Sequence, residues 1–353
     1  MKKYFCLFLS AIVLTMSIVL FPENSMTVKA ANKTVNIVID PGHGGTGERN
    51  LGAQYNGLSE KELTLQVANA LKAELEKYDN VNVYMTRTTD TLVSLEDRAK
   101  YAKSVNADFV YSIHFNASAG HDFYGSEVWT SAFGNGYMMG YNFGQIVGAE
   151  WNALGLYQKG TKSKVGGSGK DYYGIIRHCV ARQIPCVILE HAYLDHGYDV
   201  PKVKSDGFLT KLGAADATAI AKYFKLKSSV TGADYSNYSY TSVKKPSGTM
   251  YQDETEPETC EIKVLSTDPA SGNVLVEMTA KDNQSPVIYF SYSYDGGKNF
   301  CYLQMWDRSK TTQSFNVKVP SGTTNPTIVC RCYNNYEKVA QSNVVPVTST
   351  FKY

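Results

Sequence analysis

The sequence lacks a second long apolar run, and it lacks an excess of charge of either sign. Apart from one apolar stretch near the amino terminus, no segment is apolar for long enough to span a bilayer. The formal net charge is only +2, so there is no basic excess of the kind that nucleic-acid binding requires. These absences argue against a polytopic membrane protein and against a nucleic-acid partner.

The one apolar stretch has the pattern of a secretory signal. Met1-Lys2-Lys3 gives a basic start, residues 5–21 are apolar, and Val28-Lys29-Ala30 gives an end of the small-x-small type. We expect a signal peptide over residues 1–30, cleaved after Ala30, and a mature protein that is secreted, extracellular or associated with a cell wall. An uncleaved anchor is the rival interpretation, and the short apolar run disfavours it.

Tryptophan is scarce and cysteine is moderate. The chain holds 3 tryptophans against 26 tyrosines, and Cys6 lies in the expected signal. The remaining cysteines show no zinc-ribbon or thioredoxin spacing; they are Cys179, Cys186, Cys260, Cys301, Cys330 and Cys332. Export permits disulfides, and buried free thiols are an equal alternative.

Composition indicates a globular protein of two domains. The hydrophobic fraction is 43% and the charged fraction 19%, and about 320 residues after the signal are more than one core usually holds. Residues 227–258 are rich in Ser, Thr, Tyr, Lys and Pro and end in an acidic run, which is typical of a linker. We therefore predict domains over residues 31–226 and 259–353, joined by a linker over 227–258.

Strands alternate with helices in the first domain. Capping boxes at Ser59/Glu62 and Ser94/Asp97 predict two helix starts. Residues 159–173, rich in Lys, Gly and Ser, are either a mobile flap or a plain surface loop. Together the pattern predicts an α/β domain, a mostly parallel twisted sheet flanked by helices. The strands expected are 35–39, 81–87, 108–113, 125–129 and 186–189, and two further helices are expected near 137–154 and 205–224.

The second domain reads as all-β. Seven short alternating runs follow residue 259, separated by glycine, proline and Asp-Gly turns such as Asp295-Gly296-Gly297. This pattern predicts a β-sandwich of immunoglobulin-like type. No repeat or binding motif assigns its role, so binding of wall glycans, binding of a protein and a spacer function stay open.

Two histidines and a glutamate fall where they can meet. His43 follows the strand at 35–39, Glu60 begins the next helix, and His114 follows the strand at 108–113. Two histidines and a carboxylate are the ligand set of a catalytic zinc site that leaves one position for water. Such a site needs a further carboxylate for proton transfer, and Glu190 after the strand at 186–189 is the candidate. The bland alternatives are a turn histidine and a carboxylate that complements a helix dipole.

Several motifs in one order resemble a known family. They are Val-Ile-Asp-Pro-Gly-His-Gly-Gly at 38–45, Gly-Leu-Ser-Glu-Lys-Glu-Leu-Thr-Leu at 57–65, Tyr-Met-Thr-Arg-Thr-Thr-Asp at 84–90, Leu-Glu-Asp-Arg-Ala at 95–99, Ser-Ile-His-Phe-Asn-Ala at 112–117, the segment 125–128 and the segment 188–194. Together these resemble the zinc-dependent N-acetylmuramoyl-L-alanine amidases of amidase 3 type, over roughly residues 35–224.

The resemblance implies hydrolysis of the amide between N-acetylmuramic acid and L-alanine in peptidoglycan. It assigns His43, Glu60 and His114 as ligands of Zn²⁺ and Glu190 as the catalytic glutamate that activates a zinc-bound water. Asp40 either orients His43 or simply forms the turn at the strand end.

The sequence departs from the family at two places. His191 stands where similar enzymes usually carry a small residue, and Leu194-Asp195-His196 replaces a more usual Leu-Ser-Asn. His191 adds a proton relay or a substrate contact, or merely fills space, whereas His121, His178 and His196 are expected to be surface or packing residues. Residues 131–173 are too few to add an autoinhibitory helix, so we expect an open site.

Two rival functions remain at this stage. One is a different zinc hydrolase of the wall, such as a peptidase, which would release other products. The other is a non-catalytic wall-binding protein, which the intact set of His43, Glu60, His114 and Glu190 disfavours.

Overall fold

A six-stranded sheet forms the centre of the first domain. The computed structural model describes residues 34–47 and 50–353, so the expected signal peptide lies outside the described residues. The strands run in the order β4-β1-β5-β8-β6-β7, and all neighbours are parallel except β8 and β6. They are β1 (Val35–Pro41), β4 (Val81–Met85), β5 (Phe109–Asn116), β6 (Ser126–Thr130), β7 (Gln158–Ser163) and β8 (Cys186–Tyr193). A small hairpin, β2 (Gln54–Tyr55) and β3 (Leu58–Ser59), precedes the first helix.

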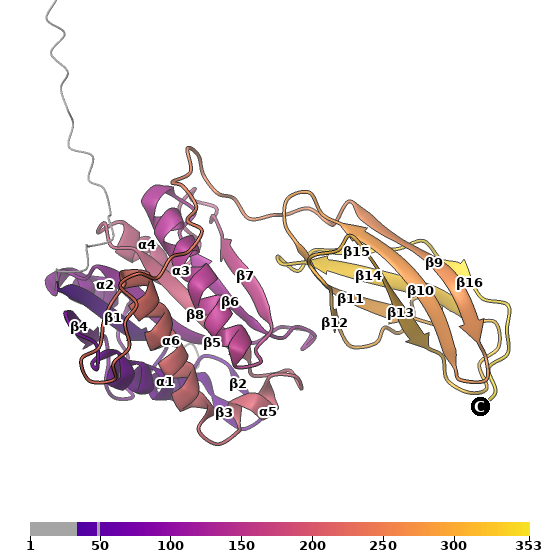
Figure 1. Ribbon diagram of the computed structural model, residues 1–353, viewed down its shortest axis with the longest axis horizontal. Coiled ribbons are helices and arrows are strands. Elements are labelled where there is room, and N and C mark those ends of the chain that lie inside the picture. Colours follow the sequence, from indigo (N-terminus) through magenta and orange to yellow (C-terminus); the bar gives the residue numbers. More distant parts are fainter. Residues whose placement is uncertain (1–33, 48–49) are drawn as a thin grey trace, which may run out of the picture.

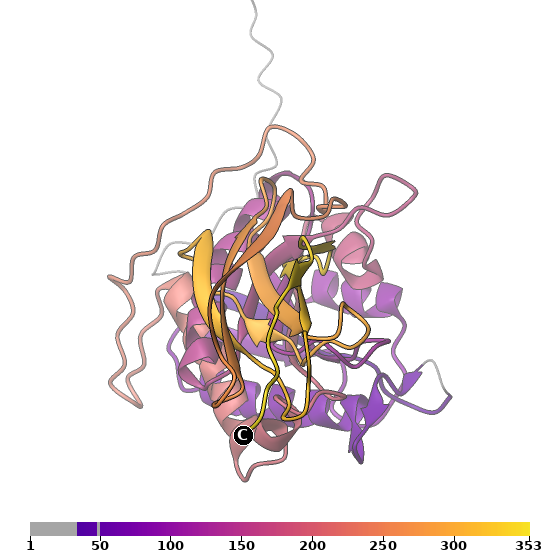
Figure 2. The same ribbon diagram turned by 90° about the vertical axis from the view of Figure 1, so that its right-hand side faces the viewer.

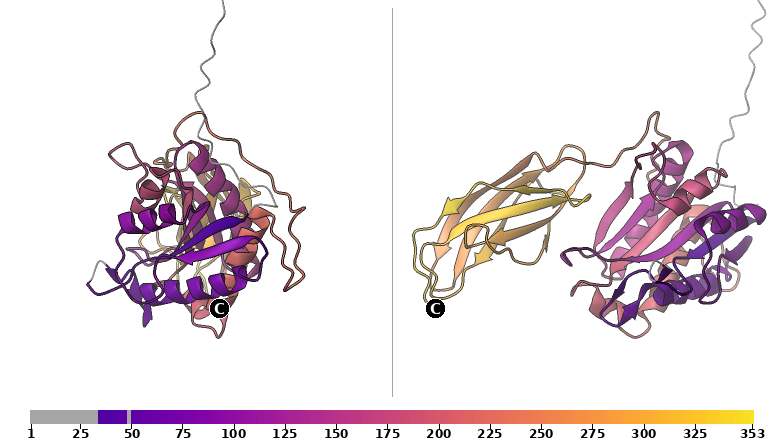
Figure 3. Two further views of the ribbon diagram at one scale, coloured as in Figure 1. Left: turned by 90° about the vertical axis from the view of Figure 1, so that its left-hand side faces the viewer. Right: turned by 180° about the vertical axis from the view of Figure 1, so that it is seen from behind.

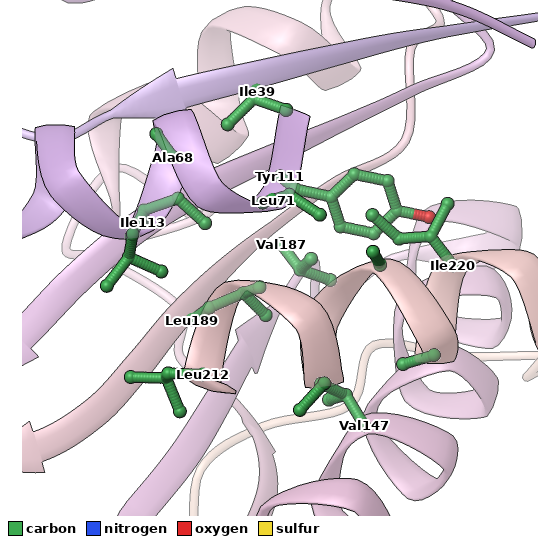
Figure 4. Close-up of a cluster of buried hydrophobic side chains, with 14 of the residues drawn as sticks. Ile39, Ala68, Leu71, Tyr111, Ile113, Val147, Val187, Leu189, Leu212 and Ile220 are labelled. Carbon is green, nitrogen blue, oxygen red and sulfur yellow. The ribbon is translucent and has the colours of Figure 1, made fainter. Parts of the chain in front are cut away.

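Helices cover both faces of this sheet (Figure 1). One face packs on α1 (Glu60–Leu75), α3 (Gly134–Ala153) and α6 (Phe208–Phe224), and the other on α2 (Leu95–Ser104) and α4 (Gly174–Val180). The short α5 (Val200–Val203) lies before α6. Figure 4 shows the larger core, where Ile39, Tyr111 and Leu189 of the sheet meet Leu71 of α1 and Ile220 of α6. The predicted α/β class is confirmed.

The two capping boxes behave differently. The Ser94 hydroxyl accepts a hydrogen bond from the Asp97 amide at the start of α2, as predicted. Ser59 is the N-cap of α1 but makes no side-chain cap bond. Its hydroxyl instead accepts from the Gln54 side chain within the β2–β3 hairpin, so that prediction was right about the helix start and wrong about the bond.

Three local expectations were wrong. Residues 158–163 are not part of a loop but form β7, an edge strand in which Lys159 and Lys162 are buried. His114 and Glu190 lie inside β5 and β8 rather than beyond them, because both strands continue for two or three residues toward their carboxyl ends. The helix α4 was not expected at all.

The second domain consists of two antiparallel sheets that share one core, so the predicted sandwich is confirmed. Figure 2 looks onto this domain with the first domain behind it. One sheet has the order β13-β10-β9 and the other β12-β11-β14-β15, with β16 paired to β14. The strands are β9 (Thr259–Asp268), β10 (Asn273–Lys281), β11 (Val287–Ser293), β12 (Gln304–Met305), β13 (Thr312–Lys318), β14 (Thr327–Asn334), β15 (Val339–Gln341) and β16 (Val345–Pro346). All six cysteines of the described chain are free thiols.

The segment between the domains packs against the first domain rather than hanging free. Tyr235, Tyr238 and Tyr240 lie against its larger core, and the backbone carbonyl of Met250 accepts from the Ser163 hydroxyl of β7. Figure 3 shows this segment crossing to the second domain from behind. Within the described ranges, no helix is long and apolar enough to cross a membrane.

The two domains touch through a shared apolar cluster. Tyr124 of the first domain packs with Ile288, Tyr289 and Leu303 of the second. Polar bonds surround this contact, because the Tyr157 hydroxyl donates to the Ile288 carbonyl at 2.6 Å and the Tyr289 hydroxyl donates to the Tyr124 carbonyl. The second domain is therefore fixed beside the end of the sheet at which β5 and β8 finish.

Candidate metal centre

Three of the predicted site residues converge. His43 follows β1, Glu60 is the first residue of α1, and His114 lies near the end of β5. One ligand atom from each lies within 4.8 Å of the others. The Glu60 Oε1 atom is 3.2 Å from His43 Nε2 and 2.9 Å from His114 Nδ1. Ligands on a tetrahedral zinc, bound at about 2.0–2.1 Å, are separated by about 3.3 Å. The donor set and its spacing therefore fit a zinc ion.

Two glycines make room for these ligands. A Cβ on Gly42 would lie 2.3 Å from the His114 ring. A Cβ on Gly52 would lie 2.3 Å from Glu60 Oε2 and 2.8 Å from the His43 ring, and Gly52 also has a φ of +69°. Larger residues at either position would displace a ligand. This explains the glycines at positions 42 and 52.

Two arginines hold the backbone that carries His43. Its φ of 61° lies in the left-handed region, which a non-glycine residue adopts only when its surroundings require it. The Arg98 guanidinium donates to the His43 carbonyl at 2.7 Å and to the Pro41 carbonyl at 2.7 Å. Arg87 donates to the Pro41 and Gly42 carbonyls at 3.0 and 2.8 Å. The motifs contained both arginines, but their spacing did not indicate this role.

Asp40 acts on this loop through Arg98. Its carboxylate accepts from Arg98 at 2.6 Å, from the Thr86 hydroxyl at 2.5 Å and from the Ser112 hydroxyl at 2.7 Å. Burial raises the pKa of Asp40, but Arg98 and the two hydroxyls outweigh it, so the pKa is lowered and the group is ionised. Asp40 makes no hydrogen bond to the His43 ring within the described structure; it anchors the arginine that holds the His43 backbone.

Glu60 is held as a carboxylate. Burial raises its pKa, but hydrogen bonds and charge interactions with His114 and His43 bring the pKa far below its usual range. The backbone amides of Ala53 and Phe115 donate to its oxygens at 2.7 and 3.1 Å. An ionised carboxylate oriented by two amides is suited to bind a cation.

Glu190 lies next to the cluster, and its pKa is shifted in the opposite direction from that of Glu60. In the sheet it pairs with His114 of β5 on one side and with Glu127 of β6 on the other. Burial, followed by the charges of Glu60 and Glu127, raises the pKa of Glu190 well above its usual value. Its Oε2 atom is buried and has no hydrogen-bond partner among the described residues. A raised pKa makes the carboxylate form a stronger base than an ordinary glutamate, so this group is suited to proton transfer.

His114, Glu190 and Glu127 form a row of neighbours across β5, β8 and β6. A buried ion cluster lies at the Glu127 end of this row, and the sequence did not predict it. The Glu127 carboxylate lies 2.6 Å from Lys162 Nζ and 3.2 Å from Lys159 Nζ, and all three side chains are at most 2% exposed. Lys159 also contacts Glu337 of the second domain. Residues 159–173 have the composition of a loop because they are rich in glycine and serine. The strand within them was not expected because its buried positions hold Lys159 and Lys162, which give no apolar pattern.

The remaining histidines lie away from the cluster or behind it. His191 is fully buried, and its ring contacts the His114 carbonyl at 3.2 Å and the Asp216 carboxylate at 2.9 Å. It therefore supports the backbone of β5 from the far face of the sheet. His121 pairs with Asp195 at 2.8 Å. Between residues 131 and 173 the chain forms only α3 and β7, and the His43 and His114 side chains keep 25% and 19% exposure.

Comparison with known proteins gives one consistent result. The profile of the Amidase_3 family, described as N-acetylmuramoyl-L-alanine amidase, matches residues 37–222. N-acetylmuramoyl-L-alanine amidase CwlM of Bacillus licheniformis is 32% identical over 201 residues, which are 54% of this chain and 70% of that protein. The sporulation-specific N-acetylmuramoyl-L-alanine amidase of Bacillus subtilis is 32% identical over 210 residues, 57% of this chain and 72% of that protein.

Solved structures resemble the same part of the chain. An N-acetylmuramoyl-L-alanine amidase from Clostridium difficile 630 aligns at 25% identity with a TM-score of 0.47, covering 54% of this chain and 97% of that one. The catalytic domain of CwlV from Bacillus (Paenibacillus) polymyxa aligns at 25% identity with a TM-score of 0.46, covering 55% of this chain and all of that one. Family membership rests on the sequence matches.

Proposed function

Because the chain belongs to the Amidase_3 family of N-acetylmuramoyl-L-alanine amidases, we propose that it hydrolyses the amide between N-acetylmuramic acid and L-alanine in bacterial peptidoglycan. The observation that carries this proposal is the convergence of His43, Glu60 and His114 beside Glu190. A non-catalytic wall-binding protein would need no proton-accepting carboxyl next to such a cluster.

We propose that His43, Glu60 and His114 hold a zinc ion. The support is the 4.8 Å convergence of their ligand atoms, the ionised state of Glu60 and the space left by Gly42 and Gly52. Bound zinc supplies Lewis-acid polarisation of a carbonyl and a water of lowered pKa.

In this proposal Glu190 moves the proton. In its ionised form Glu190 is a stronger base than an ordinary glutamate, because its pKa is raised, and it takes a proton from the attacking water at Oε2, which has no competing partner in the described structure. The same carboxyl group then returns that proton to the nitrogen of L-alanine as the amide bond breaks. The products are a muramic acid carboxylate and a peptide that begins with a free L-alanine amine.

The proposed location follows from the substrate. Peptidoglycan lies outside the cytoplasmic membrane, so we propose a secreted, extracellular or wall-associated protein, with residues 1–30 as its signal peptide. Amino-terminal sequencing of the exported protein tests this, and a start near Ala31 is expected.

Mass spectrometry of digested peptidoglycan tests the activity. We expect intact stem peptides with a free L-alanine amine; peptides cut between stem residues would instead indicate a zinc peptidase. Glu190→Gln should lower the rate about 10²–10⁴-fold, with metal content unchanged. Glu256→Gln, an exposed glutamate of the linker, is the matched control and should keep full activity. An active Glu190→Gln variant would refute the assigned role.

A further inference from the structure

A cleft of about 480 Å³ lies between the two domains, next to the candidate metal centre. The first domain contributes the loop 116–120 and side chains of β6 and β7, and the second contributes the turn of Tyr336, Glu337 and Lys338 after β14. Its volume lies within the range of sites that hold small ligands. The proposed reaction assigns no role to the residues that line this cleft.

The second domain is a fixed wall of this cleft. The Tyr336 hydroxyl donates to the Ser163 carbonyl at 3.2 Å, and Lys162 Nζ donates to the Asn335 carbonyl at 2.8 Å. Lys162 also lies 4.5 Å from the Trp129 ring centroid and 5.5 Å from that of Tyr336, so it is held between the two domains. These contacts keep the turn in place.

The cleft begins at the Glu127 end of the row formed by His114, Glu190 and Glu127. Glu127, which lines the cleft, pairs with Glu190 across β6 and β8. Asn116, also in the lining, donates to Glu127 at 3.0 Å. The cleft therefore adjoins Glu190 on its Glu127 side, and residues 116–120, which end and follow β5, also line it. Since Glu190 protonates the departing nitrogen, the leaving peptide extends on this side.

Most charges in the cleft are already paired. Glu127 is bound by Lys159 and Lys162, Glu337 by Lys159, and Glu254 by Lys338. Lys164 differs, because within the described structure it forms no ion pair and its ammonium group lies 4.2 Å from the Tyr172 ring centroid. Glu254 acts on the Lys164 charge only from beyond ion-pair distance. A half-buried ammonium without an ion pair can bind a carboxylate that enters the cleft.

We propose that this interdomain cleft is the subsite for the leaving stem peptide, and that Lys164 binds a carboxylate of that acidic peptide. This inference rests on the proposed amidase function, because it takes the direction of the leaving group from Glu190. It assigns the second domain a part in substrate binding at the catalytic site itself.

Calorimetric titration of the wild-type protein with the dipeptide L-alanyl-D-glutamate, which carries two carboxylates, tests the subsite without requiring cleavage. Lys164→Glu should weaken binding roughly tenfold, as loss of a charge-assisted bond does. Lys298→Glu makes the same charge change on an exposed lysine in the distant 295–299 turn and should bind as wild type. The dipeptide with amidated carboxylates should bind the wild type as weakly as the acid binds Lys164→Glu. Should Lys164→Glu fail to fold, Lys164→Gln replaces it, with an expected loss of about fivefold.

Two outcomes would overturn the subsite: affinity of the Lys164 variant within twofold of wild type, or an equal loss in Lys298→Glu. Kinetics on muramyl-peptides adds a second readout, in which Lys164→Glu should raise KM about tenfold and leave kcat nearly unchanged. Wild-type protein that releases no L-alanine-terminated peptide would refute the amidase function, while the titration would still decide whether the cleft binds an acidic peptide.

Discussion

The two ends of the row His114, Glu190 and Glu127 are built in different ways. At the metal end, every residue that shapes the site comes from the first domain, and Arg87 and Arg98 hold the loop that carries His43. At the cleft end, the buried charges of Glu127 and Lys159 are completed by Glu337, which lies 178 residues farther along the chain than Lys159.

The two ends should therefore respond differently to mutation, the metal end in metal binding and the cleft end in folding stability. The metal end depends on loops in which glycines leave little free space and arginines fix the carbonyl groups. Metal binding there should therefore be sensitive to any larger side chain. The cleft end depends on charges removed from water, where an unpaired partner is costly. Changes at the metal end should therefore affect chemistry, and changes at the cleft end should affect folding and domain contact.

The largest expected effect is removal of the metal. A strong chelator should abolish amide cleavage, and added zinc should restore it, because the proposed reaction needs a Lewis acid. The contact between the domains should survive, since Lys162 and Asn335 lie outside the metal ligands. Activity assays with limited proteolysis between the domains measure both; a chelated protein that retains full activity would contradict the zinc assignment.

The next largest effect should come from adding a single methyl group at the metal end. Gly42→Ala places a Cβ against the His114 ring and should lower zinc affinity about 100-fold, the upper range for disturbed support of a ligand. Gly167→Ala, where nothing lies within 4 Å, should bind zinc normally. Competition with a coloured chelator gives the affinities, and equal values for the two variants would remove the steric argument.

At the cleft end, Lys162→Met should destabilise the fold. It leaves the buried Glu127 with one ammonium partner instead of two and should cost about 3 kcal/mol of unfolding free energy. Glu337→Gln, whose side chain is 32% exposed, should cost less than about 1 kcal/mol. Denaturant unfolding measures both, and similar costs would show that burial does not set the strength of these pairs.

Acid should act on the cleft end through Glu127. Burial raises its pKa, but Lys159 and Lys162 lower it to about 2 in the folded protein, against 4.5 for the free side chain. The stability from this group is therefore fully present above about pH 4.5 and is lost as the pH falls toward about 2. Its size is on the order of 3 kcal/mol. Unfolding free energy measured between pH 2 and 5 checks this, and stability independent of pH in that range would exclude it.

The same comparison explains what the sequence could predict. The metal end was predictable because each of its three residues lies at a strong local signal. His43 follows the end of a strand, Glu60 lies at the start of a helix, and His114 lies near the end of another strand. Even there, the strand lengths at His114 and Glu190 depended on neighbouring strands far along the chain. The expected cap bond of Ser59 is absent because its hydroxyl accepts from Gln54 in the adjoining hairpin.

The cleft end was not predictable from local pattern. Lys159 and Lys162 look like solvent-exposed residues until Glu127 and the second domain are placed around them. Likewise, the composition of residues 227–258 indicated a linker but did not reveal that its tyrosines pack on the first domain. Long-range pairing of polar groups leaves no periodic signal in the sequence.

The contact of Lys159 with Glu337 has a consequence for how the protein could be divided or recombined. The region shared with the family ends at residue 222, yet a side chain inside that region relies on one supplied more than 100 residues after it ends. A chimera that kept the first domain and exchanged the second would inherit a buried ammonium group without its outer carboxylate. The unit that can be transplanted is therefore larger than the unit that relatives share.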